Sequence, residues 1–340
     1  MKIIESYTLN TQTVIFLVWI QNIQNIHGSN SPWVTWWAYE GIAGPQHWGY
    51  LNPDWVLCQS GKFQSPINIE PRWLLYDPKL RRMSLDLPTT VNGTFKNAGN
   101  NLIFTLDTTV LYNGNFSDGP LLYTYKLSQV HIHIGQNNSH GSEHRIDGKS
   151  FAAEIHFVCY NVNLFKSLPE ARAMPYGVAI LAVFVEITQS SENNNQALSI
   201  LFDKASSIPQ QNQETRVHDF NLKALIPETN YYVTYEGSFT HPGCQETVTW
   251  VIINRPIFIR ASQIDRIRFL QKRQIDSQMT LLEGNIRPLM PLNNRVVRTN
   301  INYHRTVGLC DMKRTSFYEG LFQDVVISSP ICASYFFQER

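Results

Sequence analysis

Stretches rich in β-branched and aromatic residues dominate the middle of this 340-residue chain. Such stretches are typical of strands, and we predict strands over residues 101–106, 123–134, 153–160, 178–187 and 247–259. The stretch 178–187 has almost no polar side and is expected to be a central strand covered on both faces. Apolar residues at helical spacing predict two helices. These residues are Leu198, Leu201, Phe202 and Ala205 in the first helix and Ile264, Ile267 and Leu270 in the second. The pattern indicates a β-dominated fold with helices at the margins of a large sheet.

No linker divides residues 33–304, so we predict a single domain there. Before it, Lys2 precedes the apolar run 14–20, which is too short to cross a bilayer because a spanning helix needs about 20 apolar residues. We interpret residues 1–28 as a secretory signal peptide without a defined cleavage point; an ordinary N-terminus is the alternative. The tail 305–340 shows no clear periodicity.

Three glycosylation triplets, which begin at Asn92, Asn115 and Asn137, support an extracellular location. The charge is nearly balanced, with 28 Lys and Arg against 27 Asp and Glu. A nucleic-acid partner or an acidic membrane surface is therefore not expected, and no transmembrane segment is predicted. The function must lie in a localised site.

Histidines on two predicted strands form the candidate site. Strand alternation places Gln129, His131 and His133 on one face, and it places Glu154 and His156 on one face of another strand. Three neutral histidines with one open position are the ligand set of a catalytic zinc site. Gln129 and Glu154 each precede a ligand by two residues and can accept a hydrogen bond from its second ring nitrogen. The residues therefore predict a Zn²⁺ site at His131, His133 and His156.

The segments 142–146 (Ser-Glu-His-Arg-Ile) and 154–158 (Glu-Ile-His-Phe-Val), with Phe151 between them, resemble the signature of α-class carbonic anhydrases. The likeness covers about 270 residues and is strongest to the secreted carbonic anhydrase-related branch, whose members typically lost zinc ligands. It implies a single carbonic anhydrase-like domain with a mostly antiparallel, twisted central sheet, zinc as cofactor, and CO2 and bicarbonate as ligands.

The resemblance also implies roles for individual side chains. The Thr240 hydroxyl would orient the nucleophile and donate its proton to Glu143, and His144 and Tyr235 would support Glu143 as a buried pair. An apolar wall for CO2 would consist of Val158, Ile180, Phe239, Val248 and Trp250. His241 either relays protons or crowds the bicarbonate site.

Two departures from the family pattern bear on turnover. Asn100 stands where fast members carry a proton-shuttle histidine, and an amide cannot titrate. Ile134 replaces the Trp that usually follows the second ligand, which implies weaker retention of zinc. Slow turnover is expected.

The cysteines divide into three groups. The resemblance implies a disulfide between Cys58 and Cys244. Strand alternation turns Cys159 away from His156, so we expect a buried free thiol there. Cys310 and Cys332 either pair within the tail or link chains.

Two functions follow from these residues. The first is a secreted zinc carbonate dehydratase, which hydrates CO2 reversibly to bicarbonate and a proton. The alternative is a catalytically weak or silent extracellular binding module that acts through protein partners. A structural zinc protein is disfavoured, because no fourth protein ligand is apparent.

Overall fold

The computed structural model describes residues 36–107, 114–268, 270–275, 278–281 and 284–302. The predicted signal peptide (1–28) and the predicted tail (305–340), which contains Cys310 and Cys332, lie outside the described residues. All described helices and strands belong to one compact unit that begins at Ala38. None of the helices in the described residues is long and apolar enough to cross a membrane.

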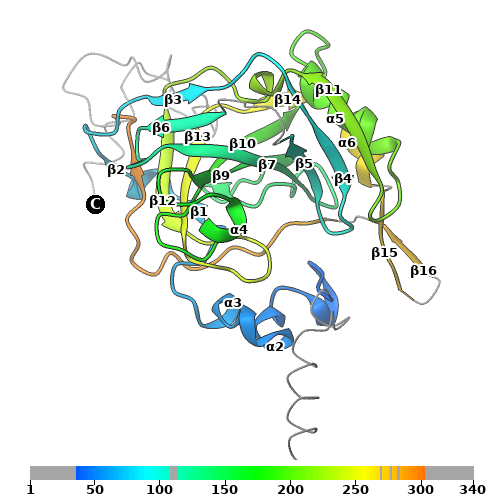
Figure 1. Cartoon of the computed structure of the whole chain (residues 1–340), viewed down its shortest axis with the longest axis horizontal. Helices are drawn as coiled ribbons and strands as arrows, with labels where there is room; N and C mark the ends of the chain where they lie inside the picture. The colour runs from blue at the N-terminus through cyan, green and yellow to red at the C-terminus, as the bar shows by residue number, and fades with distance from the viewer. Residues whose placement is uncertain (1–35, 108–113, 269, 276–277, 282–283, 303–340) are drawn as a thin grey trace, which may run out of the picture. The chain divides into compact units, whose positions relative to one another are not determined.

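A sheet of 13 strands forms the centre of the domain, as the sequence predicts (Figure 1). Its strands are β2 (Leu75–Tyr76), β3 (Met83–Asp86), β4 (Val91–Asn97), β5 (Leu102–Leu106), β6 (Asn115–Asp118), β7 (Tyr125–Ile134), β9 (Ala153–Asn161), β10 (Val178–Ile187), β11 (Glu214–Phe220), β12 (Tyr232–Gly237), β13 (Val248–Ile253), β14 (Ile257–Ile259) and β17 (Arg298–Thr299). The main path runs β11-β4-β5-β7-β9-β10-β13-β12-β17-β2, while β14 pairs with β10, and β6 pairs with β3 and β7. Two further sheets have two strands each: β1 (Asn68–Ile69) with β8 (Arg145–Ile146), and β15 (Gln271–Ile275) with β16 (Gln278–Leu281).

The helices are short and lie around the sheet. The α-helices are α2 (Trp48–Leu51), α3 (Leu57–Ser60), α4 (Leu168–Ala171), α5 (Gln196–Ser206) and α6 (Ala261–Arg268). The 3₁₀ helices are η2 (Gly41–Ala43), η3 (Pro53–Trp55), η4 (Pro71–Trp73) and η5 (Leu222–Leu225).

The central position of β10 confirms the prediction from its apolar sequence. It pairs antiparallel with β9 and parallel with β13 and β14. Most other pairs in the large sheet are antiparallel, with the parallel pair of β17 and β2 as an exception. The strand predicted over residues 247–259 is in fact two, β13 and β14. The chain leaves the ladder at Asn254 and Pro256, since proline has no N–H to donate to a neighbouring strand.

A bulge in β7 sets which side chains share a face with the histidines. Leu127 is opposite Cys159 on β9, but Gln129 is opposite Val158, so Ser128 is an additional residue in β7. Beyond the bulge the faces exchange, so that Leu127 and Val130 lie in the same core cluster. The bulge therefore turns His131 and His133 to the opposite face from Leu127.

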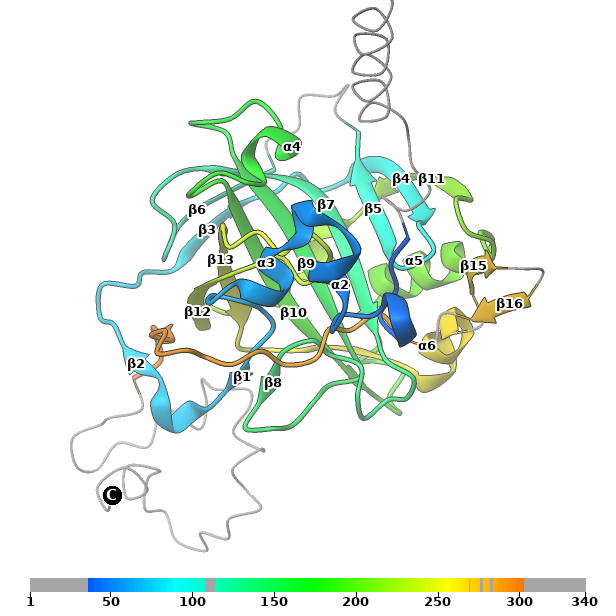
Figure 2. The same ribbon diagram turned by 90° about the horizontal axis from the view of Figure 1, so that it is seen from below.

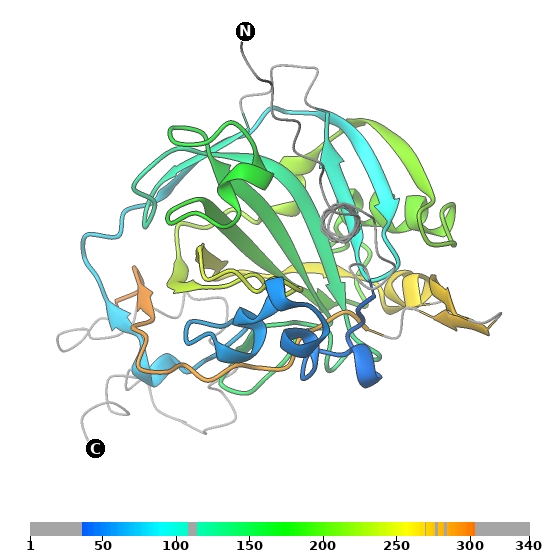
Figure 3. The same ribbon diagram turned by 60° about the horizontal axis from the view of Figure 1, so that its bottom comes forward.

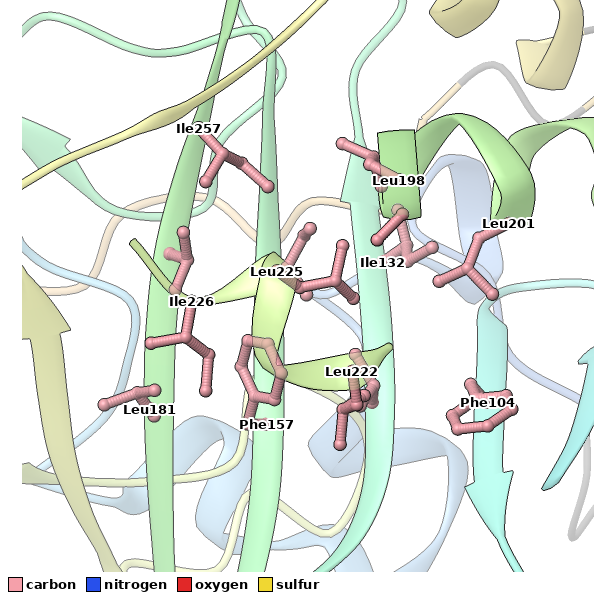
Figure 4. Close-up of a cluster of buried hydrophobic side chains, with 14 of the residues drawn as sticks. Phe104, Ile132, Phe157, Leu181, Leu198, Leu201, Leu222, Leu225, Ile226 and Ile257 are labelled. Atoms are coloured by element: carbon pink, nitrogen blue, oxygen red, sulfur yellow. The ribbon is translucent and has the colours of Figure 1, made fainter. Parts of the chain in front are cut away.

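The first face of the sheet carries the larger core. Helix α5 covers it with Leu198 and Leu201, and η5 adds Leu222 and Leu225, over strand residues that include Phe157 (Figure 4). Asn195 caps α5, since its Oδ1 accepts a 2.9 Å hydrogen bond from Leu198 N. Cys159 is a buried free thiol on this face, as predicted.

The second face carries the histidines and a smaller core. Figures 2 and 3 show α2 and α3 on one side of the sheet, together with the segment that follows residue 284. The predicted disulfide joins Cys58 of α3 to Cys244, with a Cα–Cα distance of 5.0 Å. Arg287 donates to Cys58 O (3.1 Å) and Ser65 O (2.9 Å). The disulfide holds the segment around Cys58 beside the loop that follows β12 and contains Cys244, and the Arg287 hydrogen bonds hold Cys58 and Ser65 in place.

Candidate functional site

His133 of β7 and His156 of β9 face each other on the second face of the sheet. Their ring centroids are 4.3 Å apart, and both side chains are buried. The register places His133 opposite Glu154 and His131 opposite His156. The strand alternation inferred from the sequence therefore places three imidazoles on one face of two neighbouring strands.

Each of these two histidines has one ring nitrogen engaged by a buried acceptor. His133 Nδ1 donates to the carbonyl oxygen of Asn285 (2.7 Å), and His156 Nε2 donates to Glu154 Oε1 (2.8 Å). A carbonyl oxygen only accepts, so the neutral His133 keeps its lone pair on Nε2, and His156 keeps its lone pair on Nδ1. Burial and the neighbouring His133 lower the pKa of His156 to about 3, although Glu154 opposes the shift. Neutral imidazoles with one oriented nitrogen are what a metal ion requires.

His131 lies on the same face but is oriented differently. Its Nε2 contacts Gln129 Oε1 at 3.1 Å, so the predicted partner is in place. Burial, followed by the charges of His133 and His156, holds the pKa of His131 well below its usual value. Among the described residues, the groups whose ligand atoms all lie within 4.8 Å of one another are His133–Glu143–His156 and His144–Glu154–His156. His131 belongs to neither group.

Glu143 directs one carboxylate oxygen at the two facing histidines. Its Oε1 accepts a 2.9 Å hydrogen bond from the backbone N–H of Arg287. Its Oε2 is buried without a hydrogen-bond partner in the described part of the chain, and it lies 3.6 Å from His133 Nδ1 and 3.8 Å from His156 Nδ1. Burial raises the pKa of Glu143, and His133 and the Thr240 side chain oppose this. Thr240 itself is buried beside this carboxylate, as the resemblance implies.

Glu154 is the centre of a buried hydrogen-bond chain. In addition to His156, it accepts from His144 through Nδ1 to Oε1 (2.6 Å) and backbone N to Oε2 (2.8 Å). His144 Nε2 lies 2.7 Å from Tyr235 Oη, which in turn contacts Ser65 Oγ at 2.8 Å. Burial alone would raise the pKa of Glu154, but the charge and hydrogen bonds of His144, together with His156, outweigh it and hold the pKa well below its usual value.

The hydrogen bonds of His144 and Tyr235 differ from the role that we expected for these two residues. We expected the pair to support Glu143, but their bonds lead to Glu154, and no hydrogen bond between described residues joins either to Glu143. The reason is the position of Glu154. Its side chain is on the same face of β9 as His156, and there it contacts the His144 ring. The pair therefore orients His156 indirectly.

The residues present fit a divalent metal ion. The buried Glu143 Oε2, which has no hydrogen-bond partner among the described residues, lies 3.8 Å from the free Nδ1 of His156. It also lies 3.6 Å from His133 Nδ1, which the carbonyl oxygen of Asn285 already engages. Neutral nitrogen donors of this kind suit zinc. His133 and His156 each keep one ring nitrogen free for a metal ion, and His131 lies on the same face outside this group.

The predicted apolar wall gathers in one buried cluster. Ile180 on β10 is directly opposite Val158 on β9 and Trp250 on β13. Val248 and Phe239 belong to the same cluster, which lies on the histidine face. The Trp250 ring packs edge-on against His156, with centroids 4.8 Å apart. A small apolar molecule at the histidines would therefore have aliphatic and aromatic side chains beside it.

His241 borders the site together with a cation that the sequence did not suggest. Its ring centroid is 6.2 Å from that of His131 and 4.9 Å from that of Phe239. Arg172 Nη2 lies 2.7 Å from His241 Nδ1. Burial, then Arg172 and His131, hold the pKa of His241 well below its usual value. His241 is thus unsuited to carry a proton near neutral pH.

The other predicted positions lie outside the histidine cluster. Asn100 follows the turn at Gly99, after β4, and Ile134 is fully buried in the core of the first face. Asn92 lies in β4 and Asn115 in β6, both partly buried, and Asn137 is exposed in a loop. Attached glycans remain a prediction at all three asparagines.

Two further residues, Asn285 and Arg287, belong to the site although the sequence did not predict them. Asn285 fixes His133 through its carbonyl oxygen, and its side chain bonds Ile134 N (2.7 Å) and Ile132 O (2.9 Å). Arg287 supplies the N–H that holds Glu143. Both lie in the extended segment after residue 284, about 150 residues from their partners. The segment Asn285-Ile286-Arg287-Pro288 lies within the stretch of the chain that resembles the family, and this was the available signal.

The chain is similar to known proteins in two comparisons. Residues 43–301 match the family described as eukaryotic-type carbonic anhydrase. The chain is 38% identical over 277 residues to carbonic anhydrase-like protein 2 of Caenorhabditis elegans, an alignment that covers 80% of this chain and 81% of that protein.

Proposed function

The chain belongs to the eukaryotic-type carbonic anhydrase family, and from this premise we propose that it is a secreted zinc carbonate dehydratase with slow turnover. The observation that carries the proposal is that the buried His133 and His156 rings face each other, with centroids 4.3 Å apart and one ring nitrogen of each bonded to a buried acceptor. His133 Nδ1 and His156 Nε2 are already bonded, so His133 Nε2 and His156 Nδ1 are free to bind a metal.

His131, His133 and His156 would hold the ion. When bound, zinc supplies the Lewis acidity that makes water a competent nucleophile at neutral pH. Glu154 and Asn285 keep two of the imidazoles oriented through their outer nitrogens. The interior of the site is therefore prepared before any ligand enters.

Thr240 and Glu143 would orient the attacking water. An ionised Glu143 accepts only, so the neighbouring Thr240 would donate its hydroxyl hydrogen to this carboxylate, and its own oxygen would accept a hydrogen bond from the water. The Arg287 N–H keeps the other carboxylate oxygen fixed at 2.9 Å. This directs a lone pair of the water toward the carbon atom of CO2.

CO2 would bind against the wall formed by Val158, Ile180 and Trp250, which is buried and apolar. Ile180 and Phe239 are bulkier than the Val and Leu that are usual in fast family members, so the pocket is tighter. Bicarbonate would form there and leave the site. The proton released in the same reaction would then have to be exported separately.

Proton export would limit turnover. Asn100 cannot titrate, and His241 lies against the Arg172 guanidinium, which disfavours a second positive charge. The proton must then reach solvent directly or through a buffer molecule. Imidazole in the medium should therefore raise the rate.

The disulfide between Cys58 and Cys244 is compatible with an extracellular location, because such bonds persist in oxidising compartments. The predicted signal peptide and glycosylation at Asn92, Asn115 and Asn137 belong to the same proposal.

The test is zinc content per chain in the purified protein, followed by stopped-flow CO2 hydration with and without imidazole. We expect stoichiometric zinc and a rate that rises with imidazole. His156→Gln should remove zinc and activity, while His218→Gln, on the exposed side of β11, should leave both unchanged. Metal-free wild-type protein without hydration activity would contradict the proposal.

A silent extracellular binding module is the second candidate. Two observations favour it: His131 stands outside the group formed by His133 and His156, and the relative from C. elegans is named carbonic anhydrase-like. Under this function the purified protein would bind an extracellular protein partner equally well after His156→Gln. Loss of partner binding in that variant, with the fold intact, would contradict it.

A further inference from the structure

A small pocket lies on the face of the sheet opposite the histidines. Its apolar lining consists of Met83, Leu85, Ile226, Tyr232 and Ile253. These residues belong to the core cluster of the first face or pack against it, and Figure 4 shows Ile226 within that cluster. Val233, the next residue on β12 after Tyr232, belongs instead to the cluster on the histidine face. The sheet therefore separates the pocket from the candidate metal site.

Hydrogen bonds hold two parts of the pocket in place. The hydroxyl of the buried Tyr232 donates to the carbonyl oxygen of Arg81 (2.8 Å), which fixes the segment that leads into β3. In the loop before β12, the carbonyl oxygen of Asn230 accepts a 2.7 Å hydrogen bond from Asn300 Nδ2. The pocket is thus formed by the fold itself and does not depend on a ligand.

The size of the pocket limits what can enter it. Its volume is about 130 Å³. An apolar cavity of about 150 Å³ is large enough to hold benzene, whereas pockets for drug-sized ligands have volumes of about 300 Å³ or more. The pocket therefore has room for one phenyl ring or one short branched aliphatic group.

The rim of the pocket carries more positive than negative charge. Arg82, Lys223 and Glu228 line it, and all three side chains are exposed. No ion pair within the described residues includes any of them. Two cations beside one carboxylate favour a ligand with a negative charge next to its apolar group.

We propose that this pocket binds a small carboxylate whose apolar group has about the size of a phenyl ring. The ring would displace water from the apolar side chains, and burial of apolar surface is favourable. The Arg82 guanidinium would donate two parallel hydrogen bonds to the carboxylate, and Lys223 would add a second positive charge. Recognition of this ligand requires neither a bound metal nor CO2 hydration, because the site lies on the other face of the sheet.

The experiment follows methionine methyl groups by NMR while phenylacetate is added to the full purified chain at fixed ionic strength. Met83 lines the pocket and is the reporter, and the exposed Met174, which is not part of the lining, is the internal control. We expect a saturable shift of the Met83 methyl signal and no saturable shift of the Met174 signal. Phenylacetamide, which has the same ring but no charge, should bind about tenfold more weakly or less tightly still.

Two sets of variants test the charges on the rim. The double variant Arg82→Gln with Lys223→Gln should weaken phenylacetate binding by about tenfold or more, because both cationic donors are lost. Glu228→Gln should tighten it, since a like charge is removed. Lys62→Gln is the matched control, because Lys62 is an exposed cation outside the pocket, and its affinity should equal that of the wild type. A thermal melt of each variant establishes that the fold is intact.

His156→Gln separates this site from the proposed zinc site, since a carboxylate can also bind a metal ion. The Met83 shift should persist in this variant with unchanged affinity. Its loss there would overturn the proposal, as would the absence of a saturable Met83 shift in the wild type. Equal affinity for phenylacetamide, or unchanged affinity in the folded double variant, would overturn it as well. Failure of the proposed function shows instead in the absence of CO2 hydration and leaves the Met83 shift intact.

Discussion

Replacing Glu154 with glutamine removes the acceptor that orients His156. The carboxylate receives three hydrogen bonds: Oε1 accepts from His156 Nε2 and His144 Nδ1, and Oε2 accepts from His144 N. An amide has one accepting oxygen, so either orientation of the new side chain places its NH2 against an N–H donor. At least one buried donor is left unsatisfied, and the charge assistance of the others is lost. We expect a destabilisation of about 3 kcal/mol in the metal-free protein.

Zinc affinity should fall in the same variant by about 10- to 100-fold, which is typical for loss of a carboxylate behind a ligand histidine. The stability effect also has a defined pH dependence. Because the folded pKa of Glu154 is held below its usual value, its contribution is complete above about pH 4 and is lost as the pH falls toward the lowered pKa. The difference between wild type and Glu154→Gln should therefore narrow below about pH 4.

Urea unfolding of the metal-free proteins between pH 3 and about pH 8 measures the stability difference. Competition with a chelator measures zinc affinity. Glu192→Gln, which changes an exposed carboxylate, is the control and should leave both quantities unchanged. If Glu154→Gln were as stable as wild type at neutral pH and bound zinc within about twofold of it, the assigned role of Glu154 would be wrong.

Three further changes test other parts of the site. Thr240→Ala should keep stoichiometric zinc but lower CO2 hydration by about 100-fold, because the water is no longer oriented; an unchanged rate in stopped-flow assays removes this role. Asn100→His should raise hydration in weak buffer and have little effect at high imidazole; equal rates in both conditions contradict the assignment of proton export as the limit. Cys58→Ser should lower the free energy of unfolding by about 2–5 kcal/mol in denaturant titrations, since the bond to Cys244 closes a loop with a sequence separation of 186; a loss below about 1 kcal/mol would show that other contacts hold the loop.

Strand alternation predicted which face carries the histidines. The period of two residues puts His131 and His133 on one face, and the register of β7 with β9 then places His131 opposite His156 and His133 opposite Glu154, with the His133 and His156 ring centroids 4.3 Å apart. The apolar sequence of β10 likewise predicted its bounds and its central place, because a strand buried on both faces has no polar side.

Polar edge strands were not visible in the same way. β11 reads Glu-Thr-Arg-Val-His-Asp-Phe, and most of its side chains are exposed at the edge of the sheet beside β4. Few apolar residues repeat there with a period of two. The bulge at Ser128 was equally hidden, because an additional residue changes the pairing of two strands without a marked local signal.

Long-range partners were the least predictable part of the site. Asn285 and Arg287 reach His133 and Glu143 from an extended segment with no regular structure. The 2.6 Å hydrogen bond between His144 Nδ1 and Glu154 Oε1 also could not be predicted from the spacing of the two residues in the sequence. Arg172 gave no signal at all, since its neighbours Phe239 and His241 follow it by about 70 residues.

The most direct test of the zinc site is an X-ray absorption spectrum at the zinc edge of the purified protein, compared with the spectrum of His131→Gln. The account predicts three imidazole nitrogens and one oxygen at about 2.0–2.1 Å in the wild type, and one imidazole fewer in the variant. Two imidazoles and a carboxylate in the wild type, with no change in His131→Gln, would show that Glu143 completes the site with His133 and His156 and would contradict the three-histidine assignment.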